Sequence, residues 1–198
     1  MRLAEAVNAG LDISECTFFN LDEYVGKKSD RYTVDSFMHR YFYDRIQQQP
    51  KRKFLINGET DNISLEIERY TALLKEYPRD IQLLGLGVNG HIGANEPGTA
   101  FDSSMFCADS HDSTINATKE LFGLTLAETP TQMITMGFQE IMAAACVILC
   151  VSGAKKADAV QKVVEGEITP AVPASYLKNH PNFVLIVDEA AASLLKKS

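Results

Sequence analysis

The residues best suited to chemistry lie in one glycine-rich stretch of the chain, from Ile81 to Gly98. An apolar run at residues 81–84 is followed by three closely spaced glycines and then by Asn89, His91 and Glu96. A histidine with a carboxylate five residues further on is a candidate acid/base pair, because histidine changes protonation near neutral pH. The structural alternative is a tight turn with one incidental histidine, since loop glycines often serve backbone geometry alone.

The same glycines also resemble the fingerprint of a dinucleotide-binding loop, because Gly85, Gly87 and Gly90 follow a strand with the required spacing. That fingerprint needs a helix that begins at the third glycine, whereas Gly93 and Pro97 oppose a helix here. It also needs an acidic residue about 20 positions on, at the end of a strand. Asp109 lies near that distance, but residues 102–112 are predicted to form a polar loop. The sequence therefore argues against a nicotinamide cofactor.

Two further predicted strand ends carry candidate residues. Residues 16–21 are β-branched and aromatic, as is typical of a strand, and they run directly into Asp22 and Glu23. An acid at this point lies on the ligand-binding edge of a parallel sheet, or else it caps a helix or a turn. Lys156 lies in the turn between the apolar run 146–151 and the next helix. There it either pairs with a phosphate held at the helix N-terminus or is simply exposed.

Strands and helices alternate along the chain, which predicts an α/β fold with a mostly parallel sheet between two layers of helices. The sequence is expected to form one domain over residues 1–198, with a polar segment at 102–129 as a candidate lid. The predicted strands are 16–21, 81–84, 132–136, 146–151 and 183–187, and the predicted helices are 2–9, 36–46, 62–77, 138–144, 157–165 and 190–196. Because parallel strands end at one edge, we expect Asp22, the His91 loop and Lys156 to converge there.

Composition and charge exclude several classes of protein. The net charge of −7 and the pI near 5.1 argue against non-specific binding to nucleic acid. No apolar run approaches the ~18 residues of a membrane span, and the first residues lack the apolar core of a signal peptide. The four cysteines have no zinc-type spacing and are expected to be reduced, so we expect a cytoplasmic protein without a metal site.

These candidate residues lie in segments that resemble the glucosamine-6-phosphate deaminase (isomerase) family. The segments are NLDEYVG at 20–26, GLGVNGHIGANEPG at 85–98, SGAKKA at 152–157 and VDEAA at 187–191. The resemblance extends over nearly the whole chain. It implies a Rossmann-like α/β fold and an enzyme that converts a hexosamine 6-phosphate, glucosamine 6-phosphate first, into fructose 6-phosphate and ammonia. It also implies that neither a metal nor a nicotinamide cofactor is needed.

The resemblance assigns a role to each candidate catalytic residue. Asp22 matches the base that moves a proton between C2 and C1 of the sugar. His91 matches the group that opens the pyranose ring, and Glu96 matches a carboxylate partner of that histidine. Asn89 matches a second partner, at a position where many family members have aspartate. These roles agree with the chemistry, because ring opening requires a group that accepts one proton and returns another near neutral pH.

The substrate-binding positions of the family fall on Gly85, whose backbone would contact the sugar, and on Lys156, which would bind the phosphate. One position departs from the family pattern. The family's lid carries a phosphate-binding arginine where this chain has Glu120, with Lys119 beside it. Glutamate cannot bind phosphate, so the identity of the hexosamine stays open. The alternatives are a galactosamine-6-phosphate deaminase, a non-catalytic sugar-phosphate sensor and a 6-phosphogluconolactonase.

A second departure concerns the beginning of the chain. Family members begin with a strand and a Gly-Ser or Gly-Thr-Pro loop that cradles the substrate phosphate, followed by a helix. Here only Met1–Gly10 precedes the strand at 16–21, and this segment resembles the latter part of that helix. We therefore expect a member that lacks the first strand and its phosphate loop, and that binds phosphosugar weakly. An unpaired strand edge also leaves formation of a homo-oligomer open.

Overall fold

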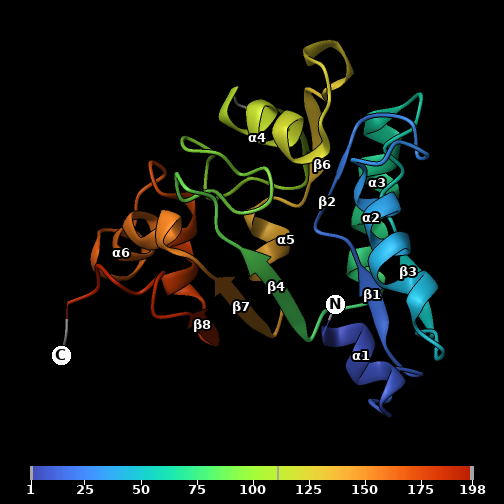
Figure 1. Ribbon diagram of the computed structural model, residues 1–198, viewed down its shortest axis with the longest axis horizontal. Helices are drawn as coiled ribbons and strands as arrows, with labels where there is room; N and C mark the ends of the chain where they lie inside the picture. The colour runs from blue at the N-terminus through green and yellow to red at the C-terminus, as the bar shows by residue number, and fades with distance from the viewer. Residues whose placement is uncertain (1, 111, 197–198) are drawn as a thin grey trace. The chain divides into compact units, whose positions relative to one another are not determined.

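A computed structural model describes residues 2–110 and 112–196, which fall into two compact units (Figure 1). Each unit is built from two segments of the chain. The first unit comprises Met1–Tyr70 with Cys107–Ile134, and the second comprises Thr71–Phe106 with Thr135–Ser198. The boundaries fall within α3 (Ile63–Glu76), β5 (Phe106–Asp109) and β6 (Gln132–Thr135).

The first unit contains two small sheets. Its helices and strands are α1 (Arg2–Asn8), β1 (Thr17–Phe19), β2 (Asp22–Tyr24), α2 (Val34–Tyr41), β3 (Arg52–Phe54), the first part of α3, most of β5, α4 (Asp112–Phe122) and β6. β1 pairs in parallel with β3, and Phe19 lies opposite Phe54. A second sheet has the strand order β2-β6-β5. Two short 3₁₀ helices, η1 (Tyr43–Arg45) and η2 (Leu126–Glu128), complete the unit.

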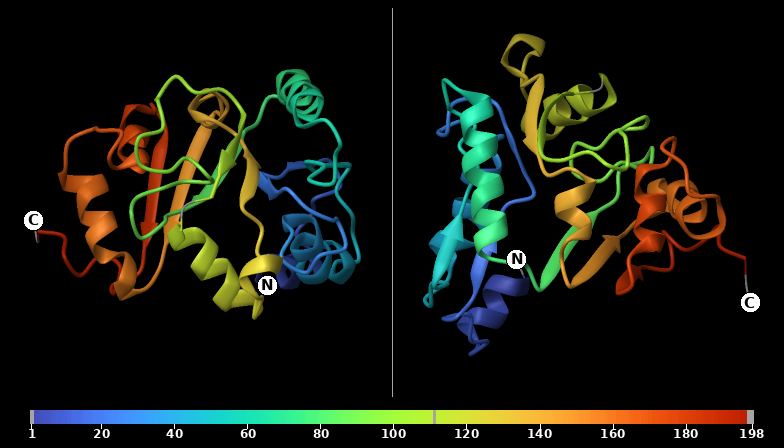
Figure 2. Two further views of the ribbon diagram at one scale, coloured as in Figure 1. Left: turned by 90° about the horizontal axis from the view of Figure 1, so that it is seen from above. Right: turned by 180° about the vertical axis from the view of Figure 1, so that it is seen from behind.

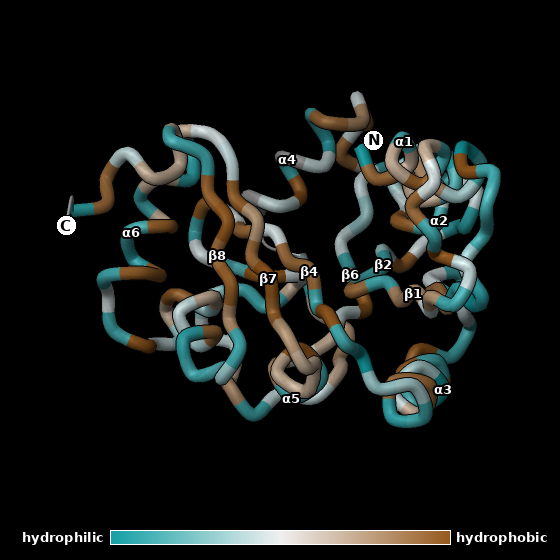
Figure 3. The backbone as a smooth tube through the Cα atoms, turned by 90° about the horizontal axis from the view of Figure 1, so that it is seen from below, coloured by the Kyte–Doolittle hydropathy of each residue, from teal (hydrophilic) through white to brown (hydrophobic). Residues whose placement is uncertain are grey.

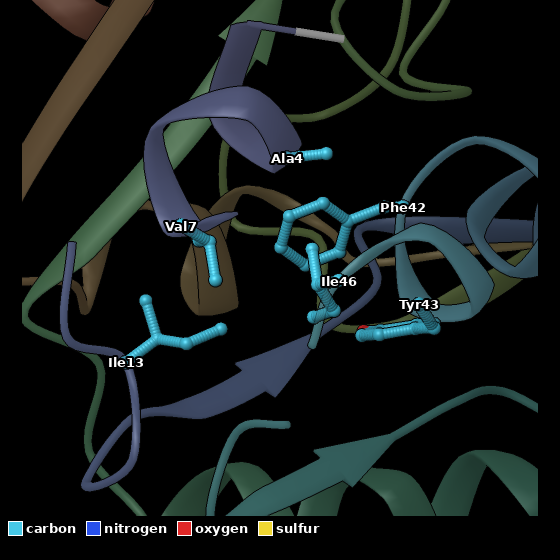
Figure 4. Packing of buried hydrophobic residues seen from close by; sticks show 6 residues of the cluster. All are labelled: Ala4, Val7, Ile13, Phe42, Tyr43 and Ile46. Atoms are coloured by element: carbon cyan, nitrogen blue, oxygen red, sulfur yellow. The ribbon is translucent and has the colours of Figure 1, made fainter. Parts of the chain in front are cut away.

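The core of the first unit forms where α1 packs against the segment after α2 (Figure 4). Ala4 and Val7 lie three positions apart and therefore on one face of α1, which is the buried face. They join a cluster with Ile13, Phe42, Tyr43 and Ile46, and the ring of Phe42 lies 5.7 Å from that of Phe18 on β1. Gly10 has φ of +108°, a conformation that favours glycine, and it follows the end of α1 as the sequence predicts.

The second unit is organised around a parallel sheet with the order β4-β7-β8, whose strands are Ile81–Gly85, Cys146–Val151 and Phe183–Val187. Figures 1 and 2 show these strands side by side, and Figure 3 shows that all three are apolar. The unit also contains α5 (Phe138–Met142), η3 (Ala154–Lys156), α6 (Ala157–Glu165) and η4 (Pro173–Asn179). The predicted α/β class and the predicted parallel pairing are therefore confirmed.

One face of this sheet is buried and the other is exposed, although both are apolar. On the buried face, Val147, Leu149 and Val151 of β7 are at most 6% exposed. The opposite face carries the side chains that alternate with them in the register of the three strands. Its exposed aliphatic members are Ile81 (58% exposed), Leu83 (61%), Val184 (40%) and Ile186 (53%), and the partly buried Ile148 lies between Leu83 and Val184.

Several elements differ from the sequence-based expectation. β2, β3 and β5 were not predicted, because each has only three or four residues and lacks a clear apolar alternation. The polar loop expected at 102–112 is wrong, since it contains β5. Within the candidate lid at 102–129 the sequence indicates only a short helical patch at 116–121, and α4 is longer than this patch. The closing helix predicted at 190–196 is also wrong. The chain forms successive turns there, and Asp188 rather than a helical carbonyl accepts the N–H of Ala191.

Two observations on the described residues concern membrane spans and metal sites. No helix in the described ranges is long and apolar enough to cross a membrane. Within the same ranges, no group of three or more histidine, cysteine, aspartate or glutamate side chains could hold a metal ion.

A buried carboxylate holds α2 against β2. The Glu23 side chain is 2% exposed and accepts the backbone N–H groups of Tyr24, Val34 and Asp35 at 2.7–2.8 Å. Two of these donors belong to the first turn of α2, where N–H groups lack helical partners. Burial raises the pKa of Glu23 from 4.5 to about 7. The three N–H donors act to lower this pKa, and the nearby charge of Asp35 acts to raise it. Glu23 is therefore a structural acid, in contrast to its neighbour Asp22 on the opposite side of the strand.

We expect Glu23→Gln to change the pH dependence of stability. The folded state holds the proton of Glu23 more tightly than the unfolded chain does. Its contribution to the free energy of unfolding is therefore complete below about pH 4.5 and is lost as the pH rises through about 7. Urea unfolding between pH 4.5 and 8 should show this loss in the wild-type protein but not in the variant.

The exposed Glu68 provides the matched control, and Glu68→Gln should leave the pH dependence of wild-type stability unchanged. The glutamine amide at position 23 also places an N–H₂ group near N–H donors, which lowers stability at every pH. The slope with pH, and not the absolute stability, therefore carries the test. Parallel pH profiles for wild type and Glu23→Gln would contradict the raised pKa.

Candidate active site

The glycine-rich loop after β4 is a compact turn fixed by its own backbone. Gly87 donates its N–H to the carbonyl of His91 at 2.9 Å, and Gly90 donates to the carbonyl of Gly87 at 3.1 Å. Gly90 has φ of +89°, a backbone conformation that residues with a side chain rarely adopt. Beyond the turn, the fully buried Asn95 donates to the carbonyl oxygens of Ile92 and Met136. The loop is thus a rigid support for the side chains that it carries.

Asn89, His91 and Glu96 lie together in this loop, as the sequence predicts. The amide of Asn89 donates to Glu96 Oε2 at 2.7 Å, and the backbone N–H of His91 donates to Asn89 Oδ1 at 3.2 Å. His91 Nδ1 lies 3.3 Å from Glu96 Oε1, at ion-pair distance but without the alignment of a hydrogen bond. The two oxygens of Glu96 thus face different partners, and the carboxylate orients Nδ1 of the imidazole while Nε2 can face a substrate.

Gly87 has a second function that the sequence analysis did not recognise. A Cβ atom built at this position would lie 2.4 Å from Cε1 and Nδ1 of His91. The imidazole ring therefore packs directly on the backbone of Gly87, and only glycine leaves room for it. The sequence shows Gly87 as a turn residue, and nothing in its spacing distinguishes a turn glycine from one that supports a ring.

A segment without any apparent chemistry holds the loop in place. Gly98 donates its N–H to the carbonyl of Pro170 at 2.8 Å, and Ala174 donates to the carbonyl of Gly90 at 2.9 Å. The fully buried Ser175 closes this segment by bonding to the backbone of Thr169 through both its acceptor and its donor. Residues 169–175 thus hold the loop at two points, Gly90 and Gly98. Sequence reasoning missed them because alanine, proline and valine predict no chemistry.

The turn that carries Lys156 begins at the same sheet edge as the His91 loop. Gly85, the last residue of β4, lies opposite Cys150 of the parallel strand β7, and the chain leaves both strands within a few residues. Lys156 ends η3 and is partly buried, and this burial lowers the pKa of its ammonium group. A phosphate dianion would favour the charged form again. The parallel register thus starts the His91 loop and the Lys156 turn from one edge of the sheet, and the approach of their side chains to a common ligand stays a prediction.

Asp22 belongs to the other unit, where it is the first residue of β2 and is partly buried. Its approach to His91 and Lys156 stays a prediction. Tyr24 on the same strand shares a hydrogen bond with Thr118 of α4 at 3.0 Å. The segment expected to act as a lid thus contacts β2 within the first unit. Glu120, the lid residue that departs from the family pattern, is exposed on α4, and the neighbouring Lys119 is partly buried.

Comparison with known proteins identifies close relatives over almost the whole chain. Residues 1–185 match the family model described as "Glucosamine-6-phosphate isomerases/6-phosphogluconolactonase". A glucosamine-6-phosphate deaminase of Streptococcus sanguinis (strain SK36) is 44% identical over 195 residues, which cover 97% of this chain and 81% of the relative. A glucosamine-6-phosphate deaminase of Streptococcus pneumoniae (strain 70585) is 43% identical over 196 residues, with 98% and 81% coverage.

Solved structures agree with these relatives. A structure described as a monomeric glucosamine-6-phosphate deaminase superposes with a TM-score of 0.90 at 37% identity, and it covers 98% of this chain and 80% of that one. The 6-phosphogluconolactonase of Trypanosoma brucei superposes with a TM-score of 0.71 at 18% identity, with 90% and 74% coverage. At 18% identity the likeness concerns the fold alone.

We expect Gly87→Ala to displace the His91 ring. The added methyl group would lie 2.4 Å from the imidazole, so the ring must move away from the backbone of Gly87. A crystal structure of the variant should show the ring displaced by about 1 Å, which restores an ordinary van der Waals distance and changes the 3.3 Å approach of His91 Nδ1 to Glu96 Oε1. Gly85→Ala is the matched control, because nothing lies within 4 Å of a Cβ atom at that position. An unmoved imidazole in Gly87→Ala would show that the backbone of Gly87 does not set the position of the ring.

Proposed function

The chain belongs to the family of glucosamine-6-phosphate isomerases and 6-phosphogluconolactonases, and we propose that it converts glucosamine 6-phosphate into fructose 6-phosphate and ammonia. The observation that carries this proposal is the cluster of Asn89, His91 and Glu96, which lies at the sheet edge from which the Lys156 turn also leaves. Relatives above 40% identity that bear the name of the deaminase support the same reaction.

The first step assigned to the site is ring opening. His91 accepts the proton of the anomeric hydroxyl group and returns a proton to the ring oxygen, which produces the open-chain amino aldehyde. Glu96 holds the imidazole in the orientation that this exchange requires and stabilises it while it is protonated. Asn89 in turn holds the second oxygen of Glu96, so the carboxylate keeps its place during the step. Lys156 binds the phosphate, and the backbone of Gly85 contacts the sugar.

The second step is the isomerisation, for which Asp22 is the proposed base. Its carboxylate removes the proton from C2 and returns one to C1, while a proton of the amino group passes to the C1 oxygen, so the amino aldehyde becomes an imine at C2 with a hydroxyl group at C1. Water then adds to the imine carbon, and ammonia leaves as the C2 ketone of fructose 6-phosphate forms. The balance is one water consumed for each ammonia released. A carboxylate suits this transfer because a single base on one face of the open chain can serve both carbon atoms.

The reaction belongs to the breakdown of amino sugars such as N-acetylglucosamine, and we place it in the cytoplasm. The four cysteines, at positions 16, 107, 146 and 150, are all free in the described chain, which fits a reducing compartment. One substitution supports a second candidate substrate. Because Glu120 stands where the family has a phosphate-binding arginine, galactosamine 6-phosphate is the alternative hexosamine.

The activity can be tested by ammonia release. We expect the protein to release ammonia from glucosamine 6-phosphate faster than from galactosamine 6-phosphate, as measured in a coupled glutamate dehydrogenase assay. The reverse order would assign the galactosamine reaction. Binding of the sugar phosphate without turnover would identify a sensor. Hydrolysis of 6-phosphogluconolactone without ammonia release from either hexosamine would identify a lactonase.

Asp22→Asn should lower kcat by at least about 100-fold while KM changes little, because the amide keeps the shape of the side chain but cannot accept the C2 proton. The exposed Asp61 provides the matched control, and Asp61→Asn should retain wild-type turnover. Exchange of the C2 proton with deuterium from the solvent isolates the step, since it should disappear in Asp22→Asn. Near-normal deaminase activity in this variant would assign the base to another residue.

His91→Gln should impair ring opening more than proton transfer. An open-chain analogue of the substrate bypasses ring opening, so it should restore part of the C2-proton exchange that the variant loses with the cyclic sugar. The comparison requires only the ratio of the two exchange rates in the variant and in the wild-type protein. An equal loss with both substrates would place His91 in the isomerisation step instead.

A further inference from the structure

One segment with family resemblance has no part in the chemistry above. It is the run from Val187 to Ala191, at the end of β8. Val187 lies opposite Val151 in the parallel pairing of β8 with β7, so the chain leaves both strands at the same level. Asp188 is the first residue beyond β8 and is exposed. Its carboxylate nevertheless has several partners from the neighbouring turn.

Asp188 ties the turn after β7 to the turn after β8. The backbone N–H of Gly153 donates to both carboxylate oxygens, at 3.1 and 3.0 Å. The N–H of Ala191 donates to Oδ1 at 2.7 Å, and the N–H of Asp188 itself donates to the carbonyl of Val151 at 3.3 Å. The bonds from Ala191 and Gly153 lower the pKa of Asp188 below its ordinary value. The tether is therefore charged throughout the neutral pH range.

The tethered residue Gly153 also begins the turn that contains Lys156. Gly153 has φ of +89°, and glycine is the residue with the widest choice of backbone conformations. Its carbonyl accepts the N–H of Lys156 at 3.0 Å, which closes the turn η3. A continuous path of hydrogen bonds thus runs from Asp188 through Gly153 to the backbone of Lys156. Glycine has no side chain that could restrict the turn, so the restriction comes from the bond to Asp188.

We propose that Asp188 is a positioning residue for the phosphate site, because its carboxylate fixes the Gly153 turn that presents the Lys156 ammonium group to the phosphate of the substrate. The inference rests on the proposed function, since it takes Lys156 as the residue that binds phosphate. Asp188 itself does not contact the substrate in this proposal.

The sign of the effect separates this role from a purely electrostatic one. A negative charge near an anion site weakens the binding of phosphate, so removal of the charge alone would tighten it. Loss of the tether has the opposite effect, because Lys156 must then be ordered when the phosphate binds. Asp188→Asn keeps the size of the side chain, removes the charge and replaces one of the two acceptor oxygens by an N–H₂ group, so it also weakens the tether. It therefore distinguishes the two effects by the direction in which affinity changes.

The experiment compares Asp188→Asn and Asp188→Ala with the wild-type protein, and Glu189→Gln serves as the control at the adjacent exposed carboxylate. We expect KM for glucosamine 6-phosphate to rise about tenfold in both Asp188 variants, the loss typical of a hydrogen bond to a charged group, while kcat stays within about twofold. The inhibition constant of inorganic phosphate should rise by a similar factor. Amide exchange at Gly153 should become faster in both variants and stay unchanged in the control.

Four results would overturn the proposal. Tighter phosphate binding in Asp188→Asn would show that Asp188 acts only through its charge. Unchanged phosphate binding would show that Asp188 has no effect on the phosphate site. A lower kcat with unchanged KM would indicate a smaller active fraction, as expected of a general structural residue. Unchanged exchange at Gly153 would show that the tether does not restrict the turn.

Failure of the proposed function has a different signature. If the wild-type protein releases no ammonia, calorimetric titration with inorganic phosphate and with fructose 6-phosphate still tests the tether. Weaker binding in Asp188→Asn than in wild type would then support the positioning role without the deaminase reaction. Equal binding would overturn it, and so would a wild-type protein that binds neither ligand, since Lys156 would then hold no phosphate.

Discussion

The parallel pairing of β4 with β7 is the constraint on which the chemistry of the second unit depends. Parallel strands in register end at the same level, so the chain leaves β4 at Gly85 and β7 at Val151 on one edge. The two connections differ in kind. The first is a rigid loop that carries His91 and Glu96, and the second is a short turn that carries Lys156. One backbone pairing therefore brings an acid/base group and an ammonium group to the same edge.

Each of these connections is held by residues that take no part in chemistry. Residues 169–175 hold the His91 loop through hydrogen bonds to Gly90 and Gly98, and Asp188 holds the turn at Gly153. In both cases the point of attachment is a glycine with positive φ. Glycine allows the sharp change of direction that brings a side chain to the edge, but it leaves the backbone with many alternatives. A tether from elsewhere in the chain selects one of them.

Much of this arrangement could be predicted from the sequence. β4, β7, β8 and α6 are apolar or strongly amphipathic, and their positions were predicted within one residue or two. The grouping of Asn89, His91 and Glu96 followed from their close spacing in one loop. Other features could not be predicted, because they depend on contacts between distant parts of the chain. The hydrogen bonds from residues 169–175 to the His91 loop, and the support of the His91 ring by Gly87, cannot be recognised from local spacing or polarity.

The exposed apolar face of the β4-β7-β8 sheet affects how the second unit responds to denaturant. Ile81, Leu83, Val184 and Ile186 are already 40–61% exposed in the folded state. Unfolding exposes only the remaining part of their surface, so they add less than buried residues to the heat capacity change and to the slope of stability against urea concentration. The sheet is therefore stabilised chiefly by its other face, where Val147 and Leu149 are fully buried. The second unit should accordingly unfold over a broader range of urea concentration than a domain of its length with both sheet faces covered.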